Sequence, residues 1–514
     1  MNQTTAITKP TLLLCLILCL LFAPNRTQAQ QSLSTSEKSY QRARRVLEAG
    51  IEALGGLEAV AAIHNLTVVE TGKHTRVEHP APEAQYDVID WAETVIVDFS
   101  GVRLYHEIKD WNWVTVINGN RAFTANVATK IAWQLQSVSV QNYSQATEKF
   151  PHYLLREALS QRAASLRWLG EAELKDRKQQ VIIFSDKNAR QVSLYFDAQT
   201  HLLTKYEYLY TDSVTGDTLQ EHLFPGYRRV GRFQVPTGLI VRKGGRVAQD
   251  VRYERFEINA LLSERMFTLP EGCEIYPPAS YQTPPPLTLT KVASDVYLMQ
   301  GVAYNNNVLV VAFNDFLMVI ESPELGTFKH ANEQAIARLK ETFPGKPIRY
   351  HAFTHFHADH GGGARAYIAE GATILTTPGN KQFVEHIAAA PFLLMPDALA
   401  RNPRQPLIEI MKGKKHVIRD EHHVVEFYDV GPYPHVKEEL IMYLPQEKLL
   451  FEGDLFTSGN GDIVAPASSS TILLADKIRQ LGLNVEQIVG VHGRLRPIAD
   501  LYTAVEKRQR MSMK

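Results

Sequence analysis

Hydrophobic residues near the start of the chain recur at helical spacing. Over residues 37–54 apolar side chains follow one another at intervals of four, four and three, which predicts a helix with one buried face. These side chains are Ala43, Leu47, Ile51 and Leu54. The Gly55-Gly56 pair that follows is typical of a helix C-terminus, and a second short helix is expected over residues 57–63.

The pattern changes to strands after residue 66 and continues to about residue 269. Short runs rich in Val, Ile, Tyr and Phe alternate there with turn residues. The clearest predicted strands are 66–71, 94–99, 180–184, 191–196, 202–210 and 239–242. A helical insertion is expected over about 144–162. These elements predict an α+β region, built as an antiparallel sheet or open half-barrel with a helix across one face.

A proline-rich stretch separates this region from a second pattern. Residues 276–286 hold five prolines in eleven positions, which predicts a stiff linker. Strands and helices then alternate in the order that a two-sheet αββα sandwich needs. Expected strands are 296–298, 308–313, 317–321, 347–353, 373–377, 424–429, 441–444, 449–451 and 487–491. Expected helices are 328–342, 364–370, 381–390, 471–481 and 501–510.

The N-terminus predicts export. Lys9 precedes an uninterrupted apolar run over residues 12–23, which is short for a bilayer span but suits a signal-peptide core. Small residues at Thr27 and Ala29 predict cleavage after Ala29, and an uncleaved membrane anchor is the alternative. The expected domains are a signal peptide at 1–29, a β-rich domain at 30–275, the linker at 276–286 and an αββα domain at 287–514. The expected location is the bacterial periplasm or the outside of the cell.

Composition narrows the possible partners. Hydrophobic residues make up 45% of the chain and charged residues 21%, as in ordinary globular proteins. Basic and acidic residues number 55 each, so no charge excess argues for a nucleic acid or an anionic membrane surface. The chain after residue 29 keeps one cysteine, Cys273, which cannot form an internal disulfide.

Candidate chemistry concentrates in the sequence Thr-His-Phe-His-Ala-Asp-His-Gly-Gly-Gly at residues 354–363. His355 and His357 are two positions apart, so they point the same way on an extended backbone and can bind one ion together. Asp359 and His360 follow where the chain is expected to turn into a helix, within reach of a second ion. Imidazole and carboxylate groups suit zinc and its first-row neighbours. The alternative is a solvated polar loop that is rich in histidine.

The His-x-His-x-Asp-His pattern after an apolar strand resembles the signature of the metallo-β-lactamase-fold hydrolases. Three later positions match the further ligands of that family, each after an apolar strand: His435 in Gly-Pro-Tyr-Pro-His, Asp454 in Leu-Phe-Glu-Gly-Asp, and His492 in Val-Gly-Val-His-Gly. The resemblance covers roughly residues 287–514. It implies one metal on His355, His357 and His435, a second on Asp359, His360 and His492, and a bridge through Asp454. The family also has an Asn near residues 305–307, often with a structural role.

The resemblance implies a zinc-dependent hydrolase with two Zn²⁺ per chain, iron or manganese being possible. A hydroxide held by the two metals would attack an ester, thioester, lactone or related electrophile in a small-molecule substrate, and Asp359 would pass a proton to the leaving group. Zinc β-lactamases usually have Cys or Ser where this chain has Asp454, which argues against efficient β-lactam turnover. A mononuclear iron enzyme similar to persulfide dioxygenases is the alternative.

The N-terminal region resembles the lipoprotein-carrier half-barrels of bacterial envelopes. The resemblance is carried by the Leu-Gly-Gly at the end of the first helix, by residues 224–236 and by residues 259–270. It implies a concave face that can hold a lipid-like ligand, so an envelope ligand-binding protein is another functional hypothesis. The other interpretation is a β domain that covers or orients the enzyme.

Overall fold

The computed structural model describes residues 33–75, 88–135, 143, 146–160, 162–187, 189–276, 286–303, 306–324, 330–457 and 464–512. The predicted signal peptide at 1–29 and almost all of the linker at 276–286 lie outside these ranges, so export and the domain boundaries stay predictions. Within these ranges, no helix is both long enough and apolar enough to cross a membrane.

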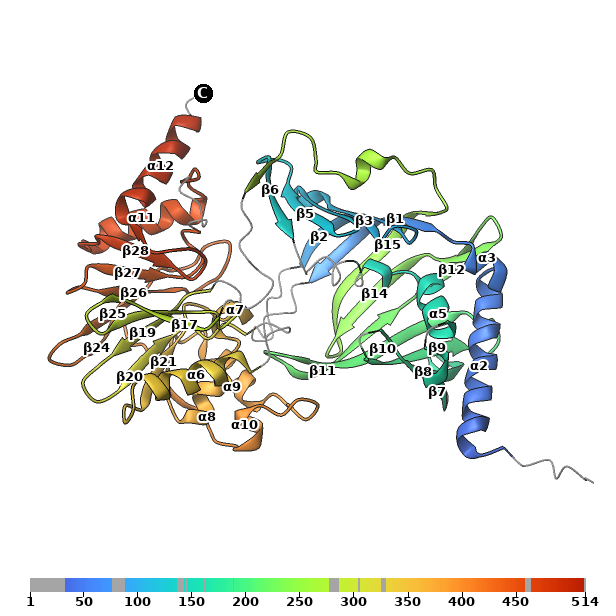
Figure 1. The fold of residues 1–514 in the computed structure, drawn as a ribbon, viewed down its shortest axis with the longest axis horizontal. Coiled ribbons are helices and arrows are strands. Elements are labelled where there is room, and N and C mark those ends of the chain that lie inside the picture. Colours follow the sequence, from blue (N-terminus) through green and yellow to red (C-terminus); the bar gives the residue numbers. More distant parts are fainter. Residues whose placement is uncertain are drawn as a thin grey trace, which may run out of the picture.

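Fourteen strands of the N-terminal region form one sheet (Figure 1). Their order is β16-β6-β5-β4-β3-β2-β1-β15-β14-β11-β10-β9-β8-β7. Neighbouring strands are antiparallel except β16, which runs parallel to β6. The strands are β1 (Asn65–Thr75), β2 (Val88–Asp98), β3 (Arg103–Ile108), β4 (Trp113–Asn118), β5 (Arg121–Asn126), β6 (Ile131–Leu135), β7 (Arg167–Leu174), β8 (Arg177–Ser185), β9 (Gln191–Asp197), β10 (Leu203–Asp212), β11 (Gly216–Leu223), β14 (Gly238–Lys243), β15 (Arg246–Ile258) and β16 (Glu274–Tyr276). A separate pair is formed by β12 (Tyr227–Val230) and β13 (Phe233–Pro236). The β-rich, largely antiparallel character is as predicted, and the half-barrel shape stays a prediction.

Three helices accompany this sheet: α2 (Thr35–Leu54), α3 (Leu57–Ala61) and α5 (Pro151–Leu159). Helix α2 begins with a capping box, in which Ser34 Oγ accepts from the Glu37 amide at 3.3 Å and the Glu37 carboxylate accepts from the Ser34 amide at 2.7 Å. Its buried face packs on the sheet, where a Cβ at Gly50 would lie 2.3 Å from the Phe196 ring.

Two expectations for this region need correction. The predicted insertion helix over 144–162 is not continuous: residues 146 and 147 are helical, residues 148–150 are not, and α5 then runs from Pro151, a residue suited to the first turn, to Leu159. Strands β3 to β6 lie inside the predicted strand region but were not among its clearest runs. Many of their residues are only partly buried, so they lack the continuous apolar runs that identified the other strands.

The C-terminal region contains two sheets and seven helices among the described residues. The first sheet has the order β17-β18-β19-β20-β21-β22-β23, and the second β24-β25-β26-β27-β28-β29. The first consists of β17 (Thr288–Ala293), β18 (Val296–Gln300), β19 (Val308–Ala312), β20 (Leu317–Ile320), β21 (Ile348–Ala352), β22 (Thr373–Thr376) and β23 (Leu407–Ile410). The second consists of β24 (Lys415–Arg419), β25 (Val424–Asp429), β26 (Leu440–Leu444), β27 (Leu449–Glu452), β28 (Gln487–Gly490) and β29 (Arg496–Pro497). The helices are α6 (Ala331–Thr342), α7 (Ala358–Gly361), α8 (Ala364–Glu370), α9 (Lys381–Ala389), α10 (Ala398–Arg401), α11 (Ser469–Leu481) and α12 (Ile498–Ser512).

Three apolar clusters hold these elements in four layers. One lies between the two sheets and joins residues such as Leu309 of β19 to Phe427 of β25. A second packs α6, α8 and α9 on the outer face of the first sheet, and a third packs α11 and α12 on the second. Figure 1 shows the resulting helix–sheet–sheet–helix order. The predicted αββα sandwich is therefore observed, and strands β19 and β20, buried on both faces, explain its long apolar runs.

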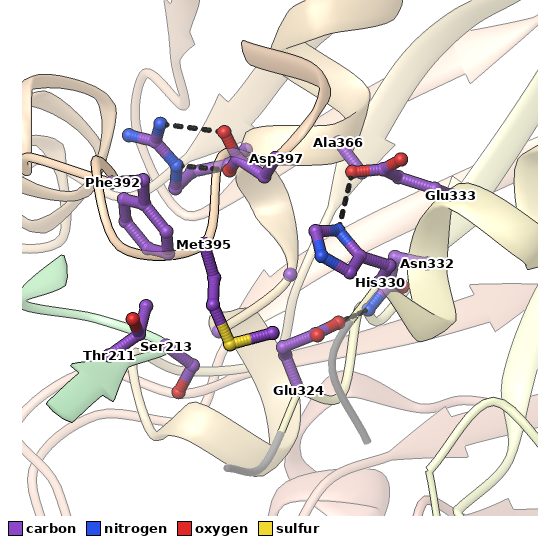
Figure 2. Close-up of a pocket in the computed structure, with 13 residues that line it drawn as sticks. Thr211, Ser213, Glu324, His330, Asn332, Glu333, Ala366, Phe392, Met395 and Asp397 are labelled. Carbon is purple, nitrogen blue, oxygen red and sulfur yellow. Dashed lines mark hydrogen bonds and ion pairs between the residues drawn. The ribbon is translucent and has the colours of Figure 1, made fainter. Parts of the chain in front are cut away.

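The hairpin between β10 and β11 joins the two regions. The Asp217 amide donates to the Pro391 carbonyl at 2.6 Å, and the Asp217 carboxylate accepts from the amides of Leu393 and Leu394 at 2.6 and 2.9 Å. Val214, at the tip of the hairpin, is buried in the C-terminal core. Beside this contact lies a cavity of about 50 Å³, in which Figure 2 shows Met395 between Ser213 and Glu324.

Candidate metal centre

The predicted ligands lie where strands of the two inner sheets end. His355 and His357 follow β21, whose backbone is extended up to Ala352. Asp359 and His360 lie in the short helix α7 that comes next, as the strand-to-helix turn predicted. The second sheet contributes the others: His435 between β25 and β26, Asp454 two residues after β27, and His492 two residues after β28.

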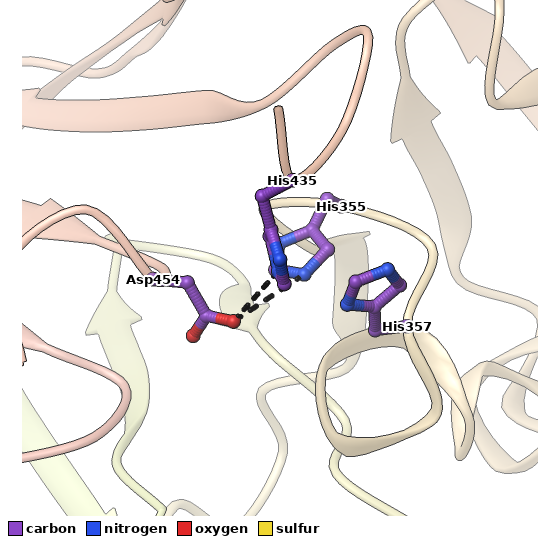
Figure 3. Close-up of side chains that lie close together, drawn as sticks. All are labelled: His355, His357, His435 and Asp454. Atoms are coloured by element: carbon purple, nitrogen blue, oxygen red, sulfur yellow. Dashed lines mark ion pairs between the residues drawn. The ribbon is translucent and has the colours of Figure 1, made fainter. Parts of the chain in front are cut away.

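The first group consists of His355, His357, His435 and Asp454, with one possible ligand atom from each lying within 4.8 Å of the others. Figure 3 shows the three imidazole rings and the carboxylate turned toward one another. The rings of His355 and His357 are 4.4 Å apart, as are those of His357 and His435. His355 and His435, 80 residues apart in the chain, therefore lie side by side.

The second group consists of Asp359, His360 and His492. Oδ2 of Asp359 lies 3.2 Å from Nε2 of His492 and 3.7 Å from Nε2 of His360. His360 is fully buried, whereas the side chains of Asp359 and His492 keep 31% and 25% of their surface exposed. This group is therefore open to small molecules on one side only.

Asp454 connects the two groups through its two carboxylate oxygens. Oδ2 lies 2.9 Å from Nε2 of His435 and 3.9 Å from Nε2 of His355. Oδ1 lies 3.1 Å from Nε2 of His492 and 3.2 Å from Nε2 of His360. One oxygen thus faces each group, which is the geometry that a bridging carboxylate needs.

The side chains present fit divalent cations. The Nε2 atom of His355 is fully buried and has no hydrogen-bond partner among the described residues, an arrangement that is costly unless another ligand satisfies it. Five imidazoles and two carboxylates form the donor set, which suits zinc and related first-row metals.

The ionisation of His355 and Asp454 suits metal ligation. Burial, together with the neighbouring His360 and His357, holds the pKa of His355 well below its usual value, so its imidazole is neutral at pH 7. Burial alone would raise the pKa of Asp454, but the charge and hydrogen bonds of the surrounding histidines outweigh it and keep that pKa well below its usual range. Burial alone would lower the pKa of His360 and of His492, but the facing carboxylates outweigh it and raise both, that of His492 to about 9. Because metals bind neutral imidazole, a cation in the second group would displace these two protons.

Two buried residues behind the ligands were not predicted. Oγ1 of Thr354 lies 3.2 Å from Nδ1 of His355 and 3.1 Å from Nδ1 of His360. Glu321 accepts from the Thr354 amide at 2.7 Å, and its other oxygen lies 3.1 Å from Nδ1 of His360. Glu321 is fully buried and has a φ of 81°, a conformation that is uncommon for a residue with a side chain. Its position directly after a buried strand was the signal available in the sequence.

Asn306 and Asn307, in the region where the family has an asparagine, form hydrogen bonds to the backbone at the same edge of the domain. Nδ2 of Asn306 donates to the Asp359 carbonyl at 2.9 Å, and Asn306 also forms an isolated β-bridge with His492. Nδ2 of Asn307 donates to the carbonyls of Gly490 and Gly493, both at 2.8 Å. These amides fix the loops that carry Asp359 and His492 relative to each other.

Comparisons with known proteins return structures of one fold. No protein-family model matches the sequence, and no curated protein matches it. Similar solved structures include a metallo-beta-lactamase from Pontibacter korlensis (20% identity, TM-score 0.32, covering 43% of this chain and 99% of that one). Another is the DIM-1 metallo-beta-lactamase (16% identity, TM-score 0.34, covering 44% of this chain and 99% of that one). A third is the metallo-beta-lactamase FIM-1 from Pseudomonas aeruginosa in its mono-zinc form (18% identity, TM-score 0.33, covering 46% of this chain and 100% of that one).

Similarity at these low TM-scores does not indicate the chemistry of this chain, which we infer from its own geometry. The four layers and the ligand loops at one edge define the C-terminal region as a domain of the metallo-β-lactamase fold. A candidate metal centre of seven side chains lies at that edge, and a large β-rich region precedes the domain in the same chain.

Proposed function

We propose that this protein is an exported zinc-dependent hydrolase that cleaves an ester, thioester, lactone or related electrophile in a small molecule. The observation that carries the proposal is the position of Asp454, with one carboxylate oxygen toward each histidine group. That position supports two cations a short distance apart, and therefore a dinuclear centre.

Two bound divalent cations would supply Lewis acidity at the substrate oxygen and a deprotonated water at neutral pH. The chain's own residues would orient the reaction. Asp359 is the carboxylate we assign to proton transfer to the leaving group, since it is 31% exposed and lies 3.2 Å from His492. His360 and His355, both fully buried, would hold their cations from the protein side.

Two features bear on the substrate class and on the number of metal ions that we propose. Asp454 stands where zinc β-lactamases usually have Cys or Ser, and the described residues 455–457 include no basic side chain to bind a drug carboxylate. A β-lactam is therefore not the proposed substrate. The second group could hold a second cation, and metal analysis separates this proposal from the single iron of a persulfide-dioxygenase-like enzyme.

The test starts from purified protein. Metal analysis is expected to give about two zinc per chain, and a panel of esters, thioesters, lactones and β-lactams is expected to reveal hydrolysis of a compound from the first three classes. The variant His357→Ala should lose activity by at least about 100-fold and lose bound zinc while staying folded. The exposed His422 provides a matched control, because His422→Ala should leave activity and zinc content unchanged.

Other outcomes point elsewhere. Equal activity in His357→Ala and wild type would contradict the catalytic proposal. One iron per chain with oxygen consumption on a persulfide would favour the dioxygenase alternative. Co-purified lipid found by mass spectrometry would support a lipid-like ligand in the N-terminal region, and fractionation of expressing cells tests export.

A further inference from the structure

We propose that Glu439 is a positioning residue that fixes the ligands of the first metal group. The inference rests on the proposed metal centre and adds a residue that the sequence did not single out. Glu439 is fully buried and lies directly before β26, behind the ligands as seen from solvent. Its carboxylate contacts three chain segments that carry ligands of the first group.

Each oxygen of the Glu439 carboxylate has its own contacts. Oε1 accepts a hydrogen bond from the Asp454 amide at 3.1 Å. Oε2 accepts the phenol hydrogen of Tyr433 and lies 3.9 Å from Nδ1 of His355. One side chain therefore reaches the loops that carry His355, Asp454 and His435, since Tyr433 precedes His435 by two residues and the two rings are 5.9 Å apart.

The surroundings leave Glu439 little freedom to move. The amide of Leu440 donates to the Thr354 carbonyl at 2.9 Å, and the amide of Val430 donates to the Glu439 carbonyl at 2.8 Å. Residue 453 is a glycine with room for nothing larger, because a Cβ there would lie 2.5 Å from Oε1 of Glu439 and 2.7 Å from Oγ1 of Thr354. The carboxylate is thus held in one place before any cation binds.

This arrangement has a chemical consequence for metal binding. Residues behind metal ligands restrict how those ligands can turn. Glu439 does so through its hydrogen bonds to the Asp454 backbone and to Tyr433 beside His435, since its 3.9 Å separation from Nδ1 of His355 is too long for a hydrogen bond. Loss of the Glu439 carboxylate should therefore weaken cation binding in the first group more than it changes the metal-free fold.

The experiment compares Glu439→Gln, Tyr433→Phe and the double variant with wild type. The readouts are zinc affinity by competition with a chromophoric chelator, the visible spectrum of the cobalt-substituted protein, and the melting temperature of the metal-free protein. Glu439→Gln should bind zinc about 10- to 100-fold more weakly with an altered cobalt spectrum. Tyr433→Phe should have a smaller effect, and the double variant should lose less than the product of the two, because both changes disrupt one network.

The matched control is Glu447→Gln. Glu447 is also buried and pairs with a histidine, His423, at 3.1 Å in the same domain, but it contacts none of the seven ligands. Its variant should keep wild-type zinc affinity. Unchanged zinc affinity and cobalt spectrum in Glu439→Gln would overturn the positioning role while leaving the hydrolase proposal intact. If Glu439→Gln does not fold, unchanged affinity in Tyr433→Phe decides against the role. A wild-type protein that binds no zinc would overturn both.

Discussion

Gly453 shows how much one missing side chain matters at this site. It precedes Asp454, its φ lies outside the left-handed region, and its Cβ position is occupied by the buried oxygens of Glu439 and Thr354. Glycine is therefore required there by close packing and not by backbone conformation. The sequence placed Gly453 in the ligand motif, but the side chains that exclude a methyl group come from two other strand ends.

We expect Gly453→Ala to weaken zinc binding by at least about 10-fold, because the added methyl must displace Asp454 or the residues behind it. A chelator-competition titration measures this. Gly482→Ala is the control, since its Cβ would enter open space at the end of α11. The left-handed backbone of Gly482 predicts a loss of about 1 kcal/mol in stability but no change in affinity. Equal zinc affinity in Gly453→Ala and wild type would contradict the steric argument.

The burial of His152 predicts how the stability of the N-terminal domain depends on pH. Burial lowers the pKa of the His152 imidazole to about 4, although an interaction with the Gln234 backbone acts in the opposite direction. Because the unfolded chain takes up a proton near pH 6.5 and the folded chain only near 4, the contribution of His152 to stability is full above pH 6.5 and falls as the pH drops toward 4. From pH 7 to pH 5 it should decrease by about 2 kcal/mol.

Urea unfolding followed by tryptophan fluorescence measures this change, since all five tryptophans lie at or before residue 168. The variant His152→Gln should lose less stability than wild type between pH 7 and pH 5. The exposed His64 serves as control, and His64→Gln should keep the wild-type slope. A His152→Gln slope equal to that of wild type would count against the neutral, buried imidazole.

At the level of elements, helix α2 and strand β21 follow from local pattern, while the outer strands of the large sheet do not. The apolar spacing of α2 and the glycine pair after it placed the helix within two residues at its start. Strands β3 to β6 pair with one another in register, but their partly exposed residues give no continuous apolar run. Their stability comes from neighbouring strands, which no short window of sequence contains.

The packing of α2 predicts a large effect for one side chain. Leu47 is fully buried against the sheet, so Leu47→Ala should lower the free energy of unfolding of the N-terminal domain by about 2–5 kcal/mol through lost apolar contact and a cavity. Urea unfolding with tryptophan fluorescence gives the value. Glu48→Ala on the exposed face should change it by less than about 0.5 kcal/mol. Equal effects at the two positions would contradict the observed orientation of the helix.

At the scale of the whole molecule, the hairpin between β10 and β11 connects the N-terminal sheet to the αββα domain. The β10–β11 hairpin inserts Val214 into the C-terminal core, and Asp217 binds the loop at residues 391–394. The seven candidate metal ligands all belong to the αββα domain, so bound cations should stabilise that domain first.

Removal of metal by a chelator should lower the melting temperature of the C-terminal domain, because a ligand that binds only the folded state stabilises it by mass action. Calorimetry measures both transitions, and tryptophan fluorescence reports the N-terminal one alone. The fluorescence transition should shift much less than the calorimetric transition of the C-terminal domain. A chelator that leaves both transitions in place would argue against a metal centre.

The sequence by itself determined the short-range features of this protein. It located the αββα alternation, because buried strands and amphipathic helices carry distinct periodicities, and it singled out the candidate ligands His355, His357, Asp359 and His360, because they are neighbours in the chain. Only the tertiary structure determined which buried residues contact these candidate ligands from the side away from solvent. Glu321, Thr354 and Glu439 act through contacts between strand ends far apart in sequence, where burial and the exclusion of water give each polar contact its strength. The fourteen-strand order was decided in the same way, because pairing between distant strands depends on the whole sheet.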